Sequence, residues 1–415
     1  MKNSSIFGLA IFAVSVVSGS AQVNTNQPAV TPGRVVVTST LPPAQPVITP
    51  IPAPRISPTP IIVGQTQPSQ ASNLTYKGLS FSQIKAKMAE AKRILQTRPM
   101  TTASSEPVVF TSIIRVAFYD VKDKRIDTVV MSKDQFLIPD FPTMLISANG
   151  KQVTSRTIRG NGVNTPVVIT GMNGEAHLPL IVQYPRETGG ILTEMAYYAS
   201  THPGLVTPEV VSAGRYYVHN VIEIARDQLK SKGYFIPPKI ADIAERLATV
   251  EHVDHLRFRT EFQPNIYNDI FALYALNEGQ TYRYSVSSAG AGGMVQMIPP
   301  TYRMVRGRYP NAALMPDFVE GMRNHVNATQ AMLLYMQMTW DDLAASPTVT
   351  NAMQTGIATQ EQLMAAGYNS NPAKLAGYIN RGGENWTSLI PRETKIYLQI
   401  WDSLERAVAL APRKF

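Results

Sequence analysis

A single glutamate, Glu278, closes an apolar helical pattern and is followed by residue types that commonly build ligand sites. Ser287 comes nine residues later, small residues occupy 289–293, and Gln296 follows them. A carboxyl group near a hydroxyl and an amide can move a proton to or from a bound molecule, and small residues let the backbone approach that molecule closely. The stretch therefore predicts a site of acid or base chemistry.

The surroundings of this carboxyl decide which chemistry it can do. Donation to a poor leaving oxygen near neutral pH needs a raised carboxyl pKa, which burial against apolar groups provides. Ile270 and Tyr274 precede Glu278 by eight and four residues, so on a helix all three would share one face. The neighbouring acids along the chain are Asp269 and Asp317. An isolated carboxyl favours a one-acid mechanism over the carboxylate pair usual in glycosidases.

The stretch from Glu278 to Thr301, EGQTYRYSVSSAGAGGMVQMIPPT, resembles a motif of the soluble-type lytic transglycosylases. This family shares the lysozyme-like fold and cleaves bacterial peptidoglycan. Its pattern is roughly E-S-x-F-x-x-x-A-x-S-x-x-G-A-x-G-x-M-Q-x-x-P-x-T. The positions that match in register, without a gap, are Glu278, Ser287, Gly290, Ala291, Gly293, Gln296, Pro299 and Thr301.

The resemblance implies a role for each matching residue. Glu278 would first protonate the leaving oxygen of the MurNAc–GlcNAc β-1,4 bond and then act as base, while the muramic C6 hydroxyl closes a 1,6-anhydro ring. Ser287 would orient the substrate N-acetyl group or the glutamate. Gly290 and Ala291 would let the backbone approach the sugar, and Gln296 would hydrogen-bond near the site. The resemblance implies no metal and no cofactor.

Two further matches follow in the family's order. Residues 365–372, AAGYNSNP, resemble A-x-x-Y-N-x-G-P, which would place Tyr368 by the glutamate and Asn369 by the sugar. Residues 390–397, IPRETKIY, resemble the closing P-x-E-T-x-x-Y. The spacing of all three motifs agrees, and the resemblance covers roughly residues 262–410.

Among the positions that depart from the family pattern, three bear on the predicted site. Gly279 replaces the serine that usually follows the glutamate, Val295 replaces a methionine, and Asn371 replaces a glycine. Asparagine tolerates left-handed backbone better than most residues, so the turn at Asn371 can survive. The loss of the serine favours a first alternative, a non-catalytic peptidoglycan-binding scaffold with a degenerate fold. A lysozyme-like hydrolase that uses water is the second alternative.

A metal site is a further alternative for the segment 251–255, EHVDH. Its two histidines, His252 and His255, are three residues apart with acidic residues around them, and histidine and carboxylate side chains can bind zinc. No third ligand cluster accompanies them in the sequence, so we expect no metal.

The N-terminus and the composition predict an exported protein. Residues 1–21 resemble a signal peptide, with Lys2, an apolar run at 6–17 and small residues before the cleavage position. An uncleaved anchor is the alternative. The chain has no cysteine, which suits the periplasm or envelope of a bacterium. The net charge of +9 favours anionic wall polymers as partners, and the predicted export and absence of a nucleic-acid motif argue against nucleic acid.

The pattern along the chain predicts a multidomain α+β protein. Residues 22–78 are predicted to be a proline-rich, disordered linker, since 22–75 hold eleven of the 31 prolines. Apolar residues at helical spacing over 81–98 predict a basic amphipathic helix, which with its connector spans 79–105. We expect this helix to pack on its own domain, although a membrane surface is the alternative.

The remaining segments are one β-rich and two helical. Strand patterns and an Asn-Gly turn predict a small antiparallel β-domain of unknown role at 106–205. Helical periodicity predicts a connector at 206–261 and an all-α lysozyme-like domain at 262–415. The linker and the β-domain suit recruitment to an envelope or secretion machine, in which such an enzyme would remodel the wall locally.

Overall fold

The computed structural model describes residues 79–98 and 110–414, so the predicted signal peptide (1–21) and linker (22–78) lie outside the described residues. The strands are β1 (Ile113–Asp120), β2 (Arg125–Ser132), β3 (Pro142–Ile146), β4 (Gln152–Thr157), β5 (Val167–Gly171), β6 (Ala176–Thr188) and β7 (Ile191–Tyr198). The helices are α1 (Phe81–Thr97), α2 (Lys133–Leu137), α3 (Pro208–Ser231), α4 (Pro238–Val250), α5 (His255–Thr260), α6 (Gln263–Asn277), α7 (Pro299–Arg308), α8 (Phe318–Arg323), α9 (His325–Ala344), α10 (Pro347–Gln354), α11 (Gln360–Asn369), α12 (Leu375–Gly382) and α13 (Arg392–Ala407).

The described chain forms two compact units and is of the α+β class. The sheet unit comprises the described residues up to 215 together with 271–289, and the helical unit comprises 216–270 and 290–414. This division differs from the predicted connector (206–261) and C-terminal domain (262–415). Most of the connector packs with the C-terminal helices, and the chain around Glu278 packs with the β-strands.

The sheet unit is built on one curled antiparallel sheet with the order β2-β1-β6-β5-β4-β3. Strand β6 is 13 residues long and pairs with β1, β5 and β7. It therefore joins strands β1, β2 and β7 to strands β3, β4 and β5. The predicted Asn-Gly turn is confirmed, because β5 pairs with β6 around Asn173-Gly174, where Gly174 has a φ of 80°. Strand β1 likewise pairs with β2 in antiparallel fashion.

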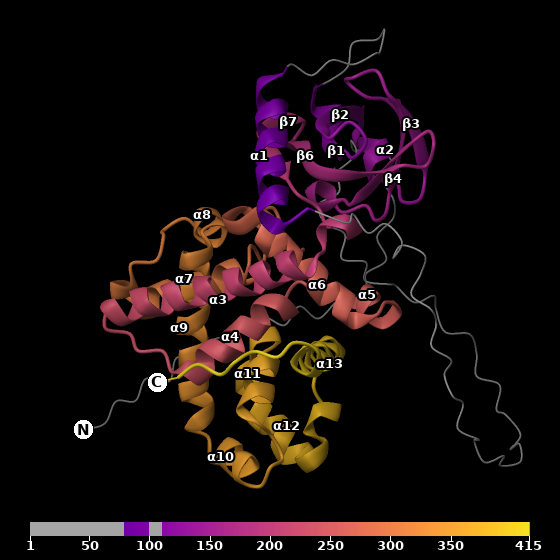
Figure 1. The fold of residues 1–415 in the computed structure, drawn as a ribbon. Coiled ribbons are helices and arrows are strands. Elements are labelled where there is room, and N and C mark those ends of the chain that lie inside the picture. Colours follow the sequence, from indigo (N-terminus) through magenta and orange to yellow (C-terminus); the bar gives the residue numbers. More distant parts are fainter. Residues whose placement is uncertain (1–78, 99–109, 415) are drawn as a thin grey trace, which may run out of the picture. The chain divides into compact units, whose positions relative to one another are not determined.

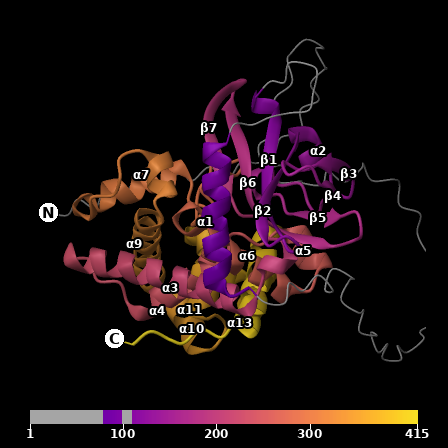
Figure 2. The same ribbon diagram turned by 45° about the horizontal axis from the view of Figure 1, so that its top comes forward.

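Helix α1 lies along this sheet, as Figures 1 and 2 show. Its Ser80 cap accepts a hydrogen bond from the Gln83 amide, and the Gln83 side chain accepts one from the Ser80 amide. Its apolar face, including Ile84, Met88 and Leu95, is buried in a core with residues of β1, β6 and α6. The prediction that this basic helix packs on its own domain is confirmed.

The helical unit surrounds helix α9, which is buried along most of its length and contacts α4, α7, α8, α10 and α11 (Figure 1). Helix α4 buries Ile240, Ile243 and Leu247 completely or nearly so. Near the C-terminus, the Arg413 side chain forms ion pairs with acidic residues of α3 and α4, including Asp242 at 2.8 Å. Within the described part of the chain, no helix combines the length and the apolar character needed to cross a membrane.

Candidate active site

Helix α6 ends at Asn277, one residue before the predicted acid. Glu278 begins a short 3₁₀ turn, Glu278–Gln280, in left-handed backbone with a φ of 47°. The prediction that Glu278 continues the helix face of Ile270 and Tyr274 is therefore wrong, because its left-handed backbone points its own side chain away from that face. Asn277 ends the helix by bonding to Ala199 in both directions, each at 2.8 Å.

The Glu278 carboxyl is exposed and paired with a lysine. Its side chain is 56% exposed, and Oε1 lies 2.8 Å from Nζ of Lys85 on α1. The apolar surroundings predicted for a proton donor are not the surroundings that the structure gives this carboxyl. Since Lys85 is itself 34% exposed, water screens the pair and limits its contribution to stability to about 1 kcal/mol.

The segment after Glu278, residues 278–289, is here called the acid-bearing loop. It lies against β7 of the same unit. The backbone N–H of Tyr282 donates to the Tyr198 hydroxyl oxygen at 3.3 Å, and the Tyr284 hydroxyl donates to Glu194 Oε1 at 3.1 Å. Burial, followed by the charge of Glu194, raises the pKa of Tyr284 to about 12, so its hydroxyl remains a proton donor at neutral pH. The sequence offered no sign that β7 holds this loop.

The first motif is divided between the two units. Ser287 is partly buried and belongs with Glu278 in the sheet unit, whereas Gly290, Ala291 and Gln296 belong to the helical unit. The two parts are therefore described separately.

Residues 290–297 of the helical unit, here called the glycine loop, need glycine at two positions. Gly290 and Gly293 have φ values of 77° and 67°, a region that residues with a Cβ rarely adopt. A methyl group on Gly293 would come within 2.2 Å of the Met322 carbonyl oxygen. Gly293 thus lets the loop pack on the end of α8, and its neighbour Ala291 is buried.

Gln296 stabilises the glycine loop through a hydrogen bond to the backbone of the loop. Its backbone is left-handed, with a φ of 47°, and its Nε2 donates to the Gly293 carbonyl oxygen at 2.8 Å. The Gly292 N–H donates to the Met297 carbonyl oxygen at 3.1 Å, which closes the loop. Gln296 therefore hydrogen-bonds to the backbone of its own motif, and its predicted role near a substrate stays a prediction.

The structure brings the second motif to the glycine loop. The Tyr368 hydroxyl, on α11, donates to the Val295 carbonyl oxygen at 2.7 Å. Tyr335 packs edge-on against the Tyr368 ring at a centroid distance of 5.8 Å. Burial is the main cause that raises the pKa of Tyr368 well above its usual value. Asn369, the last residue of α11, is partly buried beside it in the chain.

Asn371 does not adopt left-handed backbone, so the ability of asparagine to adopt it does not explain how Asn371 replaces the family's glycine. Its φ is −84°, and its side chain accepts a hydrogen bond from the Ala373 N–H at 3.0 Å. Asn371 thus caps the 3₁₀ turn Pro372–Lys374, a common use of asparagine.

Sequence reasoning missed Glu251 as a partner of the third motif. The Tyr397 hydroxyl, on α13, donates to Glu251 Oε1 at 2.6 Å. Burial raises the pKa of both Tyr397 and Tyr368, and the Glu251 charge is the next cause for each. Glu251 follows α4 and lies 146 residues from Tyr397, a separation that no local pattern reveals.

The histidine beside Glu251 has a structural partner. His252 Nε2 lies 2.8 Å from the Met294 carbonyl oxygen, so His252 supports the glycine loop from the side of α4. Across the ranges 79–98 and 110–414, no group of three or more His, Cys, Asp or Glu side chains is placed to hold a metal ion. The two-histidine spacing thus gains no support as a metal site.

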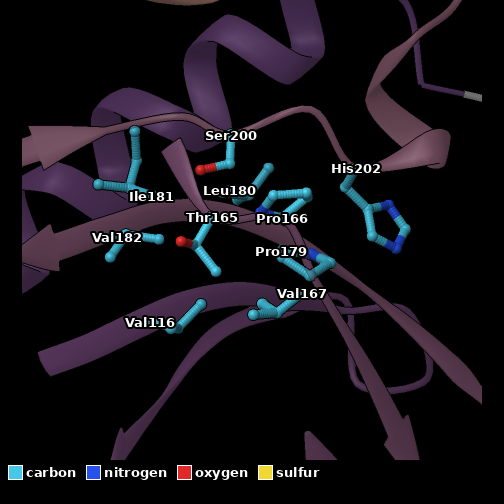
Figure 3. A pocket seen from close by; sticks show the side chains of 10 residues that line it. All are labelled: Val116, Thr165, Pro166, Val167, Pro179, Leu180, Ile181, Val182, Ser200 and His202. Carbon is cyan, nitrogen blue, oxygen red and sulfur yellow. The ribbon is translucent and has the colours of Figure 1, made fainter. Parts of the chain in front are cut away.

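A small pocket lies in the sheet unit, between β1, β6 and the chain that follows β7 (Figure 3). Its walls are mainly valine, leucine, isoleucine and proline, and its polar side chains are Thr165, Ser200 and His202. None of the predicted site residues lines it.

Comparisons with known proteins add no relative. No family model, no curated protein and no solved structure matches this chain.

Proposed function

We propose that this chain is an exported lytic transglycosylase that cleaves peptidoglycan, with Glu278 as acid and base and a lysozyme-like C-terminal domain. The observation that carries the proposal is the 2.7 Å hydrogen bond from Tyr368 to the Val295 carbonyl oxygen. It joins two motifs that lie 73 residues apart in the sequence and that match one family in order. A chance resemblance between separate segments would not require such a contact.

The glycine loop supports the same proposal. His252, Tyr368 and Gln296 each bond to a carbonyl group of the loop, and Gly293 allows it to pack closely on α8. A backbone fixed in this way can present its remaining groups to a sugar without reorganising, which is the condition for effective binding in a site.

The proposed reaction conserves atoms without using water. Protonated Glu278 gives its proton to the glycosidic oxygen as the C1–O4 bond breaks. The muramic C6 hydroxyl oxygen then bonds to C1, and its proton passes to the Glu278 carboxylate. The Glu278 oxygen that contacts Lys85 must leave that partner if it is to act.

A non-catalytic wall-binding scaffold is the second candidate. The exposure of Glu278 and its pairing with Lys85 favour it, as does Gly279 in place of the family's serine. The N-terminal segments and the sheet unit would then serve recruitment alone.

Digestion of purified peptidoglycan, followed by mass spectrometry of the products, tests these functions. We expect 1,6-anhydromuropeptides from the wild-type protein. Reducing ends would instead identify a hydrolase, and the absence of products together with retained wall binding would identify a scaffold.

The variant Glu278→Gln tests the assigned acid. We expect it to lower product release by about 100-fold or more, since general acid–base catalysis contributes factors of that order, while wall binding persists. Glu320→Gln is the matched control, because Glu320 is also exposed and pairs with one cation, Arg323 at 2.7 Å. Undiminished cleavage by Glu278→Gln would overturn the assignment.

A further inference from the structure

Strand β7 and the residue after it contact the acid-bearing loop and the end of α6 at successive points. Ala199 bonds in both directions to Asn277, the residue before Glu278. The Tyr198 hydroxyl oxygen then accepts a hydrogen bond from the backbone N–H of Tyr282. Further along the strand, Glu194 accepts one from the Tyr284 hydroxyl. Since β7 pairs only with β6 among the described strands, its other edge is the one available to the loop.

Glu194 makes the last of these contacts. It accepts the Tyr284 hydroxyl at 3.1 Å, and its Oε1 lies 3.5 Å from Nε of Arg283. The cross-strand partner of Glu194, Arg186, places its guanidinium 4.9 Å from the centroid of the Tyr284 ring. The loop is thus held by charge, hydrogen bonding and ring contact at one position of the hairpin.

The backbone of the loop needs such support. Glu278 and Tyr282 both have positive φ, at 47° and 58°. They are two of only six non-glycine residues in the described chain with positive φ, and Gln296 in the same motif is a third. Left-handed backbone costs such residues about 1–2 kcal/mol each, and it persists where the surrounding structure fixes it.

We infer that β7 positions the acid-bearing loop, and that Glu194 is a positioning residue for Glu278. The inference rests on the proposed function for its effect on turnover, but the hold on the loop can be tested without activity. It gives the sheet unit a part in catalysis, in addition to the recruitment that the sequence suggested.

The variant Glu194→Leu removes the carboxylate that holds Arg283 and Tyr284. We expect turnover on peptidoglycan to fall about tenfold with KM unchanged, because small displacements of a reacting group carry penalties of that size or larger. We also expect faster backbone hydrogen exchange in residues 279–288, since the loop loses its anchor on the strand. The Glu194 side chain is 34% exposed, so the protein should remain folded.

Two companion variants separate positioning from a general loss of stability. Glu187→Leu removes a different ion pair, which joins Glu187 of β6 to Lys133 of α2 at 3.2 Å. This variant should change neither turnover nor backbone hydrogen exchange in the acid-bearing loop. Glu194→Gln keeps an acceptor for the Tyr284 hydroxyl and should recover most of the lost turnover.

The exchange measurement makes the two proposals separable. If the wild-type protein releases no products, the proposed function fails while loop exchange still reports on β7. Unchanged exchange in Glu194→Leu would overturn the positioning role, and so would an equal effect of Glu187→Leu.

Discussion

Two glutamates of this chain have opposite environments. Glu278 is exposed and pairs with Lys85, whereas Glu251 is partly buried and accepts the hydroxyl of the buried Tyr397. A carboxyl's surroundings decide whether it serves as a reactive acid or as a fixed acceptor. The Tyr397 bond gives Glu251 a structural role, and in the proposed reaction the ion pair of Glu278 must open before Oε1 can meet a substrate.

The variant Lys85→Met tests that requirement. Under the proposed function the ammonium would compete with a substrate for Glu278 Oε1, so we expect its removal to raise the initial rate of wall digestion about two- to fivefold. An exposed pair is worth up to about 1 kcal/mol, which corresponds to about fivefold in rate. The same digestion assay, at low and moderate salt, provides the measurement.

Salt supplies the control for the lysine variant. Exposed ion pairs weaken as ionic strength rises, so the wild-type rate should approach the rate of Lys85→Met, and Lys85→Arg should behave as the wild type. A rate in Lys85→Met below the wild-type rate would show that Lys85 assists Glu278.

At the scale of elements, the glycine loop is shaped by one close approach. Gly290 and Gly293 both have positive φ, but only Gly293 lies against backbone of another element. A methyl on Gly290 would meet Pro299 at 3.7 Å, an ordinary contact, whereas a methyl on Gly293 would overlap the Met322 carbonyl oxygen. The two glycines therefore share the same backbone requirement and differ in the space available for a side chain.

Substitution of each glycine by alanine should separate backbone strain from steric overlap. We expect Gly290→Ala to lower the free energy of unfolding by about 1–2 kcal/mol, the cost of left-handed backbone. Gly293→Ala should lower it by about 3 kcal/mol or more, because overpacking adds to that cost. Urea denaturation of both variants measures the difference, and equal losses would contradict the close approach.

At the scale of the whole molecule, buried histidines of the sheet unit connect stability to pH. His202 is 1% exposed, and its Nδ1 accepts the Gly204 N–H at 3.0 Å, which requires an unprotonated nitrogen. Burial lowers the pKa of His202 from 6.5 to about 4, and burial also lowers the pKa of His177. The folded protein therefore binds fewer protons than the unfolded chain in mildly acidic solution.

The direction of the pH dependence follows from linkage between protonation and folding. Between pH 6.5 and about 4, His202 binds a proton in the unfolded state but not in the folded state, so the free energy of unfolding falls as the pH falls through this range. The full loss from His202 is about 3 kcal/mol. His202→Asn keeps an acceptor for the Gly204 N–H without a titrating group, and should therefore lose less stability on acidification.

Chemical denaturation of both proteins at pH 7.5 and pH 4.5 measures this effect. The residual loss in His202→Asn includes the contribution of His177. Identical pH dependence of the two proteins would show that His202 does not titrate differently on folding.

The elements that depend on local signals were predictable from the sequence. The apolar spacing of 81–98 predicted α1 and the packing of its apolar face, and Asn173-Gly174 marked the turn between β5 and β6. Such features depend on residues a few positions apart, whose side-chain directions follow from helix or strand geometry. The motif match likewise directed attention to Glu278 and Tyr368 from residue types and spacing alone.

The environments of these residues were decided only by the tertiary structure. The left-handed backbone of Glu278, directly after α6, turned its side chain away from the predicted apolar face, and Lys85, 193 residues earlier in the chain, became its partner. The contacts of β7 with the acid-bearing loop and of Glu251 with Tyr397 also join distant segments. Periodicity reports which face of an element is apolar, but the partner of a polar group depends on where the folded chain returns.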